Sequence, residues 1–267
     1  MGAIRSSGLP GGLSLYGAVL TYRAIALAWL GRLGEAAATV GRAIEIARRR
    51  QDSEGLVQGH QGGELVCELA GDVEGALGHA RQAVEAAATA SWAMRMEALA
   101  ILGHAHLLAG VWLPAVEAMT GALAIMRERR SSHILEGFDL RVLAEASLGA
   151  GDPDGARETA ELALAHARQH HTRVFEIGAL LAWARVHRAT DGADGAAGIE
   201  AALRDAMALV EAIEARAFAP FIHVERAALA HLLGDAAARQ RELREAHRLF
   251  TEMGAPIRAE QVARELA

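Results

Sequence analysis

The sequence predicts an all-α protein in which similar helix pairs stack into a right-handed solenoid. In five places a glycine is followed, twelve residues later, by an alanine, and these glycines recur at spacings of 40, 39, 41 and 83 residues. Such a period is typical of repeat architectures, in which each unit packs only on its neighbours. The composition agrees, because it is 52% hydrophobic, only 4% aromatic and low in Pro, which favours helices over strands.

The glycine–alanine pairs mark the turn and the second helix of each unit. The pairs are Gly31/Ala43, Gly71/Ala83, Gly110/Ala122, Gly151/Ala163 and Gly234/Ala246. We expect the glycine to end the first helix, since it can adopt a left-handed conformation. A second alanine lies midway in four units, at Ala36, Ala76, Ala115 and Ala156. Two alanines seven residues apart share one helix face, so the second helix can pack closely against its neighbours.

This register predicts six helix pairs and one further helix. The first helices cover 14–30, 54–70, 92–109, 133–149, 172–189 and 218–233, and the second helices cover 34–50, 73–89, 113–130, 153–170, 195–215 and 235–253. The fifth unit has an enlarged turn at 190–195. The expected organisation is a flexible segment at 1–12 and a solenoid over 13–267, with units 13–50, 54–89, 92–130, 133–170, 172–215 and 218–253 and a capping helix at 256–266.

Residues in the turns have the chemistry of helix starts. Asp72, Asp152 and Asp235 each follow a turn glycine, and an aspartate there can accept a hydrogen bond from a free backbone N–H. Pro153 and Pro114 are expected in the first helical position, where the missing N–H has no cost.

The two ends of the array differ. The last helix has Ala259, Val262 and Leu266 on one face and polar residues on the other, as a cap requires. The first helix has no such cap and carries an additional apolar stripe, formed by Leu15, Val19, Tyr22 and Ala26. We therefore expect either self-association through residues 1–30 or more protein before this chain.

Charge and cysteine content narrow the possible functions. The net charge of −6 argues against direct nucleic-acid binding, and the single cysteine, Cys67, suits a reducing cytoplasm. Arg23 within 14–30 argues against a membrane span.

His166 and His170 share a helix face but have no third ligand nearby, so no metal and no cofactor are expected. No nucleophile, base and metal set converges, which predicts a protein that is not an enzyme.

The repeat resembles the tetratricopeptide repeat (TPR), a helical repeat in which a small residue, a turn glycine and two alanines recur. The matching residues are Ala24, Gly31, Ala36 and Ala43 in the first unit, Gly103, Gly110, Ala115 and Ala122 in the third, and Ala144, Gly151, Ala156 and Ala163 in the fourth. Two positions depart: Glu64 replaces the small residue in the second unit, and Arg239 replaces an alanine in the sixth. The units are also longer than the usual 34 residues.

Units near 40 residues and the closing run 246–255 resemble the TPR-like C-terminal regions of large bacterial signalling proteins. Those proteins include LuxR-type ATP-binding transcription regulators and proteins that join a nucleotide-cyclase domain to an ATPase. This resemblance implies a place in bacterial signalling or transcription regulation.

The TPR resemblance also implies a groove lined by the first helices, and a protein or peptide partner bound there. The residues at the ligand-facing offsets are Thr21, Trp29, Gln58, Gln61, Glu68, Glu97, His104, Phe138, Arg141, Glu145, Arg185, Arg188, Phe221 and His231. Carboxylates lie toward the first half of this set and arginines toward the second, which suits an extended partner with unlike charges at its ends. The alternative is a sensor that binds a small-molecule inducer inside the solenoid, as LuxR-type regulators can.

Overall fold

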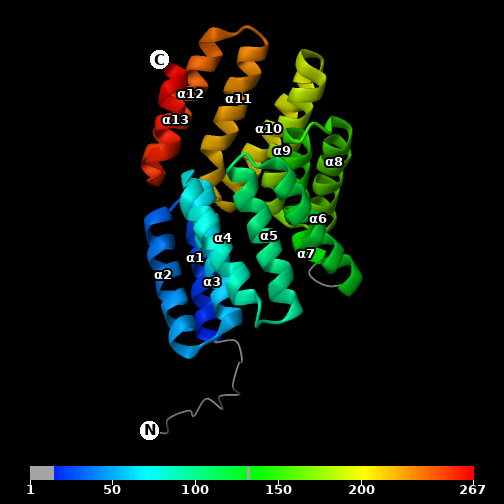
Figure 1. Ribbon diagram of the computed structural model, residues 1–267. Helices are drawn as coiled ribbons and strands as arrows, with labels where there is room; N and C mark the ends of the chain where they lie inside the picture. The colour runs from blue at the N-terminus through cyan, green and yellow to red at the C-terminus, as the bar shows by residue number, and fades with distance from the viewer. Residues whose placement is uncertain (1–14, 131–132) are drawn as a thin grey trace.

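The computed structural model describes residues 15–130 and 133–267, and every regular element in that part of the chain is helical (Figure 1). The expected flexible segment 1–12 lies outside the described residues. The α-helices are α1 (Leu15–Trp29), α2 (Leu33–Arg50), α3 (Ser53–Ala70), α4 (Val73–Ala87), α5 (Trp92–Leu108), α6 (Trp112–Arg129), α7 (His133–Gly149), α8 (Pro153–Gln169), α9 (Arg173–Asp191), α10 (Ala196–Ile213), α11 (Ala219–Leu232), α12 (Ala236–Met253) and α13 (Pro256–Leu266).

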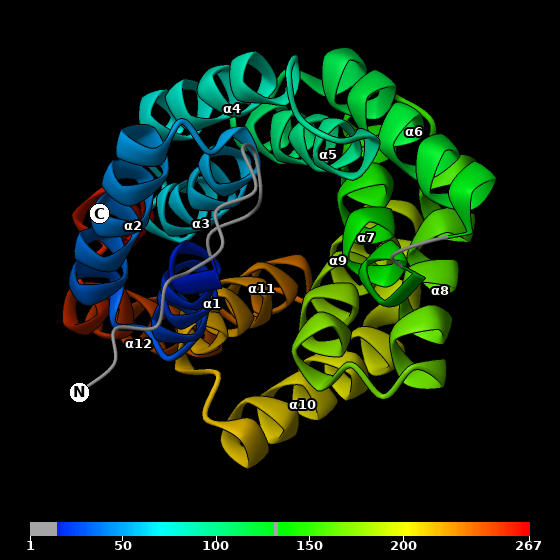
Figure 2. The same ribbon diagram turned by 90° about the horizontal axis from the view of Figure 1, so that it is seen from below.

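These helices form a right-handed, TPR-like α-solenoid of six pairs closed by α13. Figure 2 shows the pairs arranged around an open centre, with α3, α5, α7 and α9 toward the inside and α4, α6 and α8 toward the outside. Successive inner helices contact one another as well as their own outer helix. One face of each inner helix therefore points to the lumen of the solenoid, which is where a site can form.

The turn chemistry agrees with the expectation from the sequence. The five repeat glycines have φ between 70° and 88°, in the left-handed region. The side chains of Asp72, Asp152 and Asp235 each accept a hydrogen bond from the backbone N–H three residues later. One prediction was slightly wrong: Pro114 is the third residue of α6, which begins at Trp112, whereas Pro153 is the first residue of α8.

The outer helices are held close by their alanines. Ala83, Ala122, Ala163 and Ala246 are fully buried, and Ala43 is 1% exposed. The small position of the inner helix is equally tight, since a Cβ added to Gly103 of α5 would lie 2.2 Å from the Met119 sulfur. Small side chains at these positions thus set the spacing between helices.

The irregular connections lie on either side of α10. A 3-10 helix, η1 (Gly192–Gly195), follows α9 at the enlarged turn, and a second one, η2 (Arg216–Phe218), precedes α11. Such short tight turns are usual connectors between α-helices.

The C-terminal end of the solenoid returns to its beginning. Met253, Ala255 and Val262 belong to one buried cluster with Leu27 and Leu69 from α1 and α3. Figure 1 shows α11, α12 and α13 above α1 and α2, further along the solenoid, and α13 contacts α3 while the segment 216–218 contacts α1. The last helix thus packs on the first repeats as well as on α12. One turn of the solenoid therefore ends against its own beginning, and we call this closed turn the ring. Within the described residues, no helix has both the length and the apolar character needed to cross a bilayer.

Candidate ligand-binding lumen

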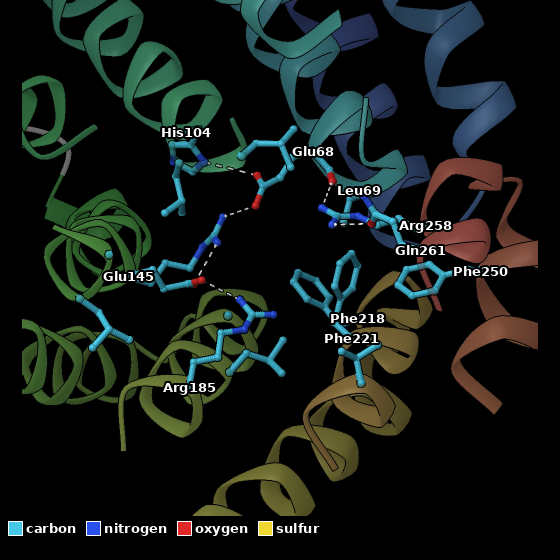
Figure 3. A pocket seen from close by; sticks show the side chains of 18 of the residues that line it. Glu68, Leu69, His104, Glu145, Arg185, Phe218, Phe221, Phe250, Arg258 and Gln261 are labelled. Atoms are coloured by element: carbon cyan, nitrogen blue, oxygen red, sulfur yellow. Dashed lines mark hydrogen bonds and ion pairs between the residues drawn. The ribbon is translucent and has the colours of Figure 1, made fainter. Parts of the chain in front are cut away.

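Two adjoining cavities lie on the inner side of the ring. The larger has a volume of about 620 Å³ and is formed by α3, α5, α7, α9, α11 and α13, with contributions from α6, α12 and η2 (Figure 3). The smaller, about 330 Å³, is formed by α1, α3, α5, α7 and α9. His104 lines both. The inner helices therefore create concave space of the size that ligand sites occupy.

Ion pairs connect the inner helices across the larger cavity (Figure 3). Arg141 of α7 donates to Glu68 of α3, with 2.9 Å between Nη2 and Oε1. Arg185 of α9 donates to Glu145 of α7 over 2.8 Å and to Glu225 of α11 over 2.7 Å. Positive and negative groups alternate from Glu68 through Arg141, Glu145 and Arg185 to Glu225, so this chain of ion pairs links α3, α7, α9 and α11.

His104 is buried beside this network and is held in its charged form. Its Nδ1 lies 3.4 Å from Glu68 Oε2 and its Nε2 lies 3.8 Å from Asp139 Oδ1. Burial alone would lower the pKa of His104, but hydrogen bonding to Asp139 and Glu68 outweighs it and raises the pKa to about 10. Burial opposes ionisation of Glu68, yet Arg141 and His104 hold its pKa well below the usual range.

The smaller cavity combines aromatic rings with carboxyl groups. Its rings are those of Tyr22, Trp29, Phe138 and Phe175, and the centroids of Phe138 and Phe175 lie 5.1 Å apart. Its carboxyl groups are those of Glu64, Glu97 and Asp139.

Burial raises the pKa of two of these carboxyl groups, and within the described part of the chain one of them lacks a hydrogen-bond partner for one oxygen. Burial raises the pKa of Glu64 to about 8 and that of Glu97 to about 7, in each case against the opposing charge of His104. Glu97 accepts a hydrogen bond from Gln61. Glu64 is 4% exposed, and its Oε1 has no hydrogen-bond partner among the described residues.

Glu64, Glu68 and His104 offer atoms within 4.8 Å of one another, as a metal site would. The electrostatics favour an ion-pair network instead. A protonated imidazole has no lone pair to offer a metal, and the Arg141 guanidinium already neutralises Glu68.

The structure brings most of the residues predicted from the TPR resemblance to these cavities. The larger cavity is lined by Glu68, His104, Arg141, Glu145, Arg185 and Phe221, and the smaller by Trp29, Gln58, Gln61, Glu97, His104 and Phe138.

Three predicted residues line neither cavity. Thr21 is 2% exposed, and its methyl group lies beside Gly62 of α3. Arg188 donates to Glu225 over 3.3 Å, and His231 is exposed in the last turn of α11. In the larger cavity carboxylates and arginines alternate and pair, whereas the smaller cavity is lined by carboxyl groups and, among the described residues, by no arginine.

Several lining or pairing residues were not predicted: Glu64, Asp139, Phe175, Glu225 and Arg258. Two signals in the sequence pointed to some of them. Glu64 stands where the repeat has a small residue. Glu145, Arg185 and Glu225 have alternating charge at successive intervals of 40 residues, which places them at one position of adjacent inner helices. The sequence contains no comparable signal for Phe175.

Fold and lumen together define a TPR-like α-solenoid with a ligand-sized interior. No family model and no curated protein matches the sequence. The chain is similar to a Rap protein solved in complex with Competence and Sporulation Factor, with a TM-score of 0.66 and 14% identity over 97% of this chain and 76% of the Rap chain. It is also similar to the apo form of RapI, with a TM-score of 0.56 and 12% identity over 94% of this chain and 96% of RapI. A third similar structure is a Podosopora anserina putative kinesin light chain with nearly identical TPR-like repeats, with a TM-score of 0.50 and 18% identity over 74% of this chain and 97% of that one. These likenesses establish the fold.

Proposed function

We propose that this chain is a non-catalytic receptor that binds a peptide, or a peptide segment of a protein, in the lumen of its solenoid. The observation that carries the proposal is the pair of adjoining cavities lined by polar groups from the inner helices. Polar groups on an ordinary protein surface face water. Here they are enclosed between aromatic and aliphatic side chains, which is typical of ligand-binding sites.

Some polar atoms at the larger cavity are still free to bond. Arg141 Nε, Glu145 Oε1 and Arg258 Nε are buried without a hydrogen-bond partner among the described residues. Buried polar atoms are normally satisfied. An extended peptide supplies both N–H donors and C=O acceptors along its length, so it can satisfy donors and acceptors of this mixed kind together.

The structural comparisons support this proposal. The Rap structure that shares this fold was solved with a bound factor, Competence and Sporulation Factor. Since a protein of the same fold binds such a factor, we infer that this chain is a receptor as well, and its cavities make the lumen the candidate binding surface. The resemblance of the closing run to bacterial signalling proteins supports the further proposal that the receptor is part of a cytoplasmic signalling or transcription regulator.

The alternative ligand is a small-molecule effector. The cavity volumes, about 620 and 330 Å³, fall in the range of small-molecule sites. Ring closure by α13 also gives the lumen more walls than an open groove has.

Direct binding to nucleic acid is not part of the proposal, because the net charge is −6 and three of the basic residues at the outer-helix ends are paired with acidic ones. Arg127 donates to Glu136 and Arg168 donates to Glu176, each over 2.8 Å. Arg49 is likewise paired with Glu45.

Affinity selection of a random short-peptide library against the purified chain, read by mass spectrometry, tests the proposal. We expect a family of related peptides to be retained, and native mass spectrometry to show one of them bound per chain. Retention of no peptide, together with a co-purified non-peptide compound in the native spectrum, would contradict the proposal and favour the effector reading.

A further inference from the structure

The smaller cavity differs in chemistry from the larger one. Arg141, Arg185 and Arg258 line the larger cavity. Among the described residues, no arginine lines the smaller cavity, and its only cationic group is the His104 imidazole, which is already paired. An anionic ligand would therefore meet carboxyl groups without a free counter-charge.

Acceptor atoms in this cavity are left without partners. Glu64 Oε1 and Gln58 Oε1 are buried and lack a hydrogen-bond partner among the described residues. Glu64 is more than nine-tenths buried, so water solvates it poorly. A buried acceptor without a donor is costly, and a carboxyl group more so. A ligand that donates hydrogen bonds and carries positive charge would satisfy these acceptor atoms.

The apolar walls favour the same kind of ligand. Trp29 and Phe175 meet edge to face, with centroids 6.2 Å apart, and both line the cavity. Aromatic rings attract cations through their quadrupole and bury the apolar carbon atoms beside the charge. Tyr22 lines the same cavity and is 64% exposed, which gives the cavity an edge that solvent and ligand can reach.

We propose that the smaller cavity binds an organic cation, an ammonium or guanidinium group on an apolar body. Glu64 and Glu97 supply the carboxyl partners, and Trp29 and Phe175 supply the apolar contacts. The cation can be a basic group of a bound peptide or a free amine, because both present the same chemistry. Only the first possibility, a basic group of a bound peptide, rests on the proposed function above.

The ionisation of the two carboxyl groups gives this binding a defined pH dependence. Glu64 faces Glu68, His104 and Arg141, and its pKa of about 8 keeps it largely neutral at pH 7. Glu97 faces Gln61, Asp139 and His104, and its pKa is about 7. A bound cation stabilises both carboxylates, so binding releases protons. Affinity should rise from pH 6 to pH 8, while an alkylammonium group stays protonated throughout.

Isothermal titration with phenethylammonium tests the inference, with 2-phenylethanol as the neutral analogue. We expect the ammonium compound to bind and the alcohol to bind about tenfold or more weakly. Titration in buffers of different ionisation enthalpy should show proton release at pH 7. Glu64→Gln and Glu97→Gln should each reduce affinity and proton release, whereas Glu85→Gln, on the exposed face of α4, should change neither.

A second arm identifies the source of the cation. Peptides retained in the library selection are resynthesised with citrulline in place of arginine and norleucine in place of lysine. If neutralising the peptide weakens its binding to the unsubstituted chain more than its binding to Glu64→Gln, the cavity binds a basic side chain of the peptide. Binding of phenethylammonium with no effect of peptide neutralisation assigns it to a free amine.

Equal affinity for the charged and neutral forms in both arms would overturn the inference. Circular dichroism of each variant verifies that it is folded. A library that retains no peptide would count against the proposed function alone, since the phenethylammonium titration does not depend on it.

Discussion

One position of the repeat shows how a single residue can convert packing into a binding surface. At the small position of the inner helix, Ala24 and Ala144 are fully buried in helix contacts. In the second unit the same position holds Glu64, also buried, whose carboxyl group lines the smaller cavity. Burying a carboxyl group opposes its ionisation, and a site for a cation is a physical reason to retain one there.

Arg185 is the residue on which the ion-pair network most depends. It bridges Glu145 and Glu225, and their charges raise the pKa of Arg185 even though burial opposes this. Arg185→Ala should lower the free energy of unfolding by about 2–3 kcal/mol, since two buried carboxylates lose their main partner. Urea denaturation measures this change.

The matched control is Arg248→Ala. Arg248 also bridges two glutamates, Glu245 and Glu252, but at the exposed surface of α12. Its removal should change the free energy of unfolding much less than Arg185→Ala does, because solvent screens an exposed ion pair. Equal effects of the two substitutions would mean that the lumen network is as solvated as the outer surface.

At the scale of the element, the sequence was sufficient to predict each helix and most turns. A glycine with positive φ and an aspartate cap are local features, and so is an alanine that must lie in a close contact. The pairing of Glu68 with Arg141 spans 73 residues and skips one inner helix, so no single repeat contains it. The burial of Thr21 likewise involves the next unit, since its methyl group lies beside Gly62 of α3.

Tight packing of the outer helices predicts that they will not accept larger side chains. Ala122 is fully buried in α6, so Ala122→Leu should lower the free energy of unfolding by about 1–3 kcal/mol. Ala124→Leu places the same side chain on the exposed face of the same helix. It should leave the thermal midpoint nearly unchanged, and equal midpoints for the two variants would contradict the assigned packing.

The first inner helix presents the apolar stripe expected from the sequence. Leu15 is 79% exposed, Val19 54% and Tyr22 64%. We predict weak self-association of the chain through this stripe, visible in sedimentation velocity as a concentration-dependent coefficient that Val19→Glu abolishes. Leu113→Glu, at a 71% exposed site on α6, is the control and should not affect association. A concentration-independent monomer for the unsubstituted chain would rule the interface out.

At the scale of the whole molecule, ring closure was not predicted from the sequence. The sequence indicates a capping helix, and α13 does cap α12. The contact of α13 with α3 depends on the curvature of the solenoid, which accumulates over six repeats and has no local signal in the sequence. Its contacts join residues far apart in the chain: Arg258 donates to the backbone oxygen of Glu68 over 2.9 Å, and it lies over the Phe221 ring at 5.3 Å.

Val262 on α13 is the apolar residue that tests this closure. It is 4% exposed in a cluster with Leu65 and Leu69 of α3. Val262→Asp should lower the thermal midpoint and increase the radius of gyration in small-angle X-ray scattering, because an unpaired buried carboxylate expels the helix. Ile257→Asp, at a 41% exposed site on the same helix, should do neither. An unchanged radius with a lowered midpoint would show that the ring does not depend on this contact.

The central claim is that the lumen of the ring is the surface that binds a peptide. Val224 lines the larger cavity and Leu232 is exposed on the same helix, α11. The decisive measurement is the affinity of a library-selected peptide for Val224→Trp and for Leu232→Trp, with both variants verified as folded. The account predicts that filling the lumen in Val224→Trp abolishes binding while Leu232→Trp retains it. Unchanged affinity in Val224→Trp would contradict the claim and move the binding surface to the outside of the solenoid.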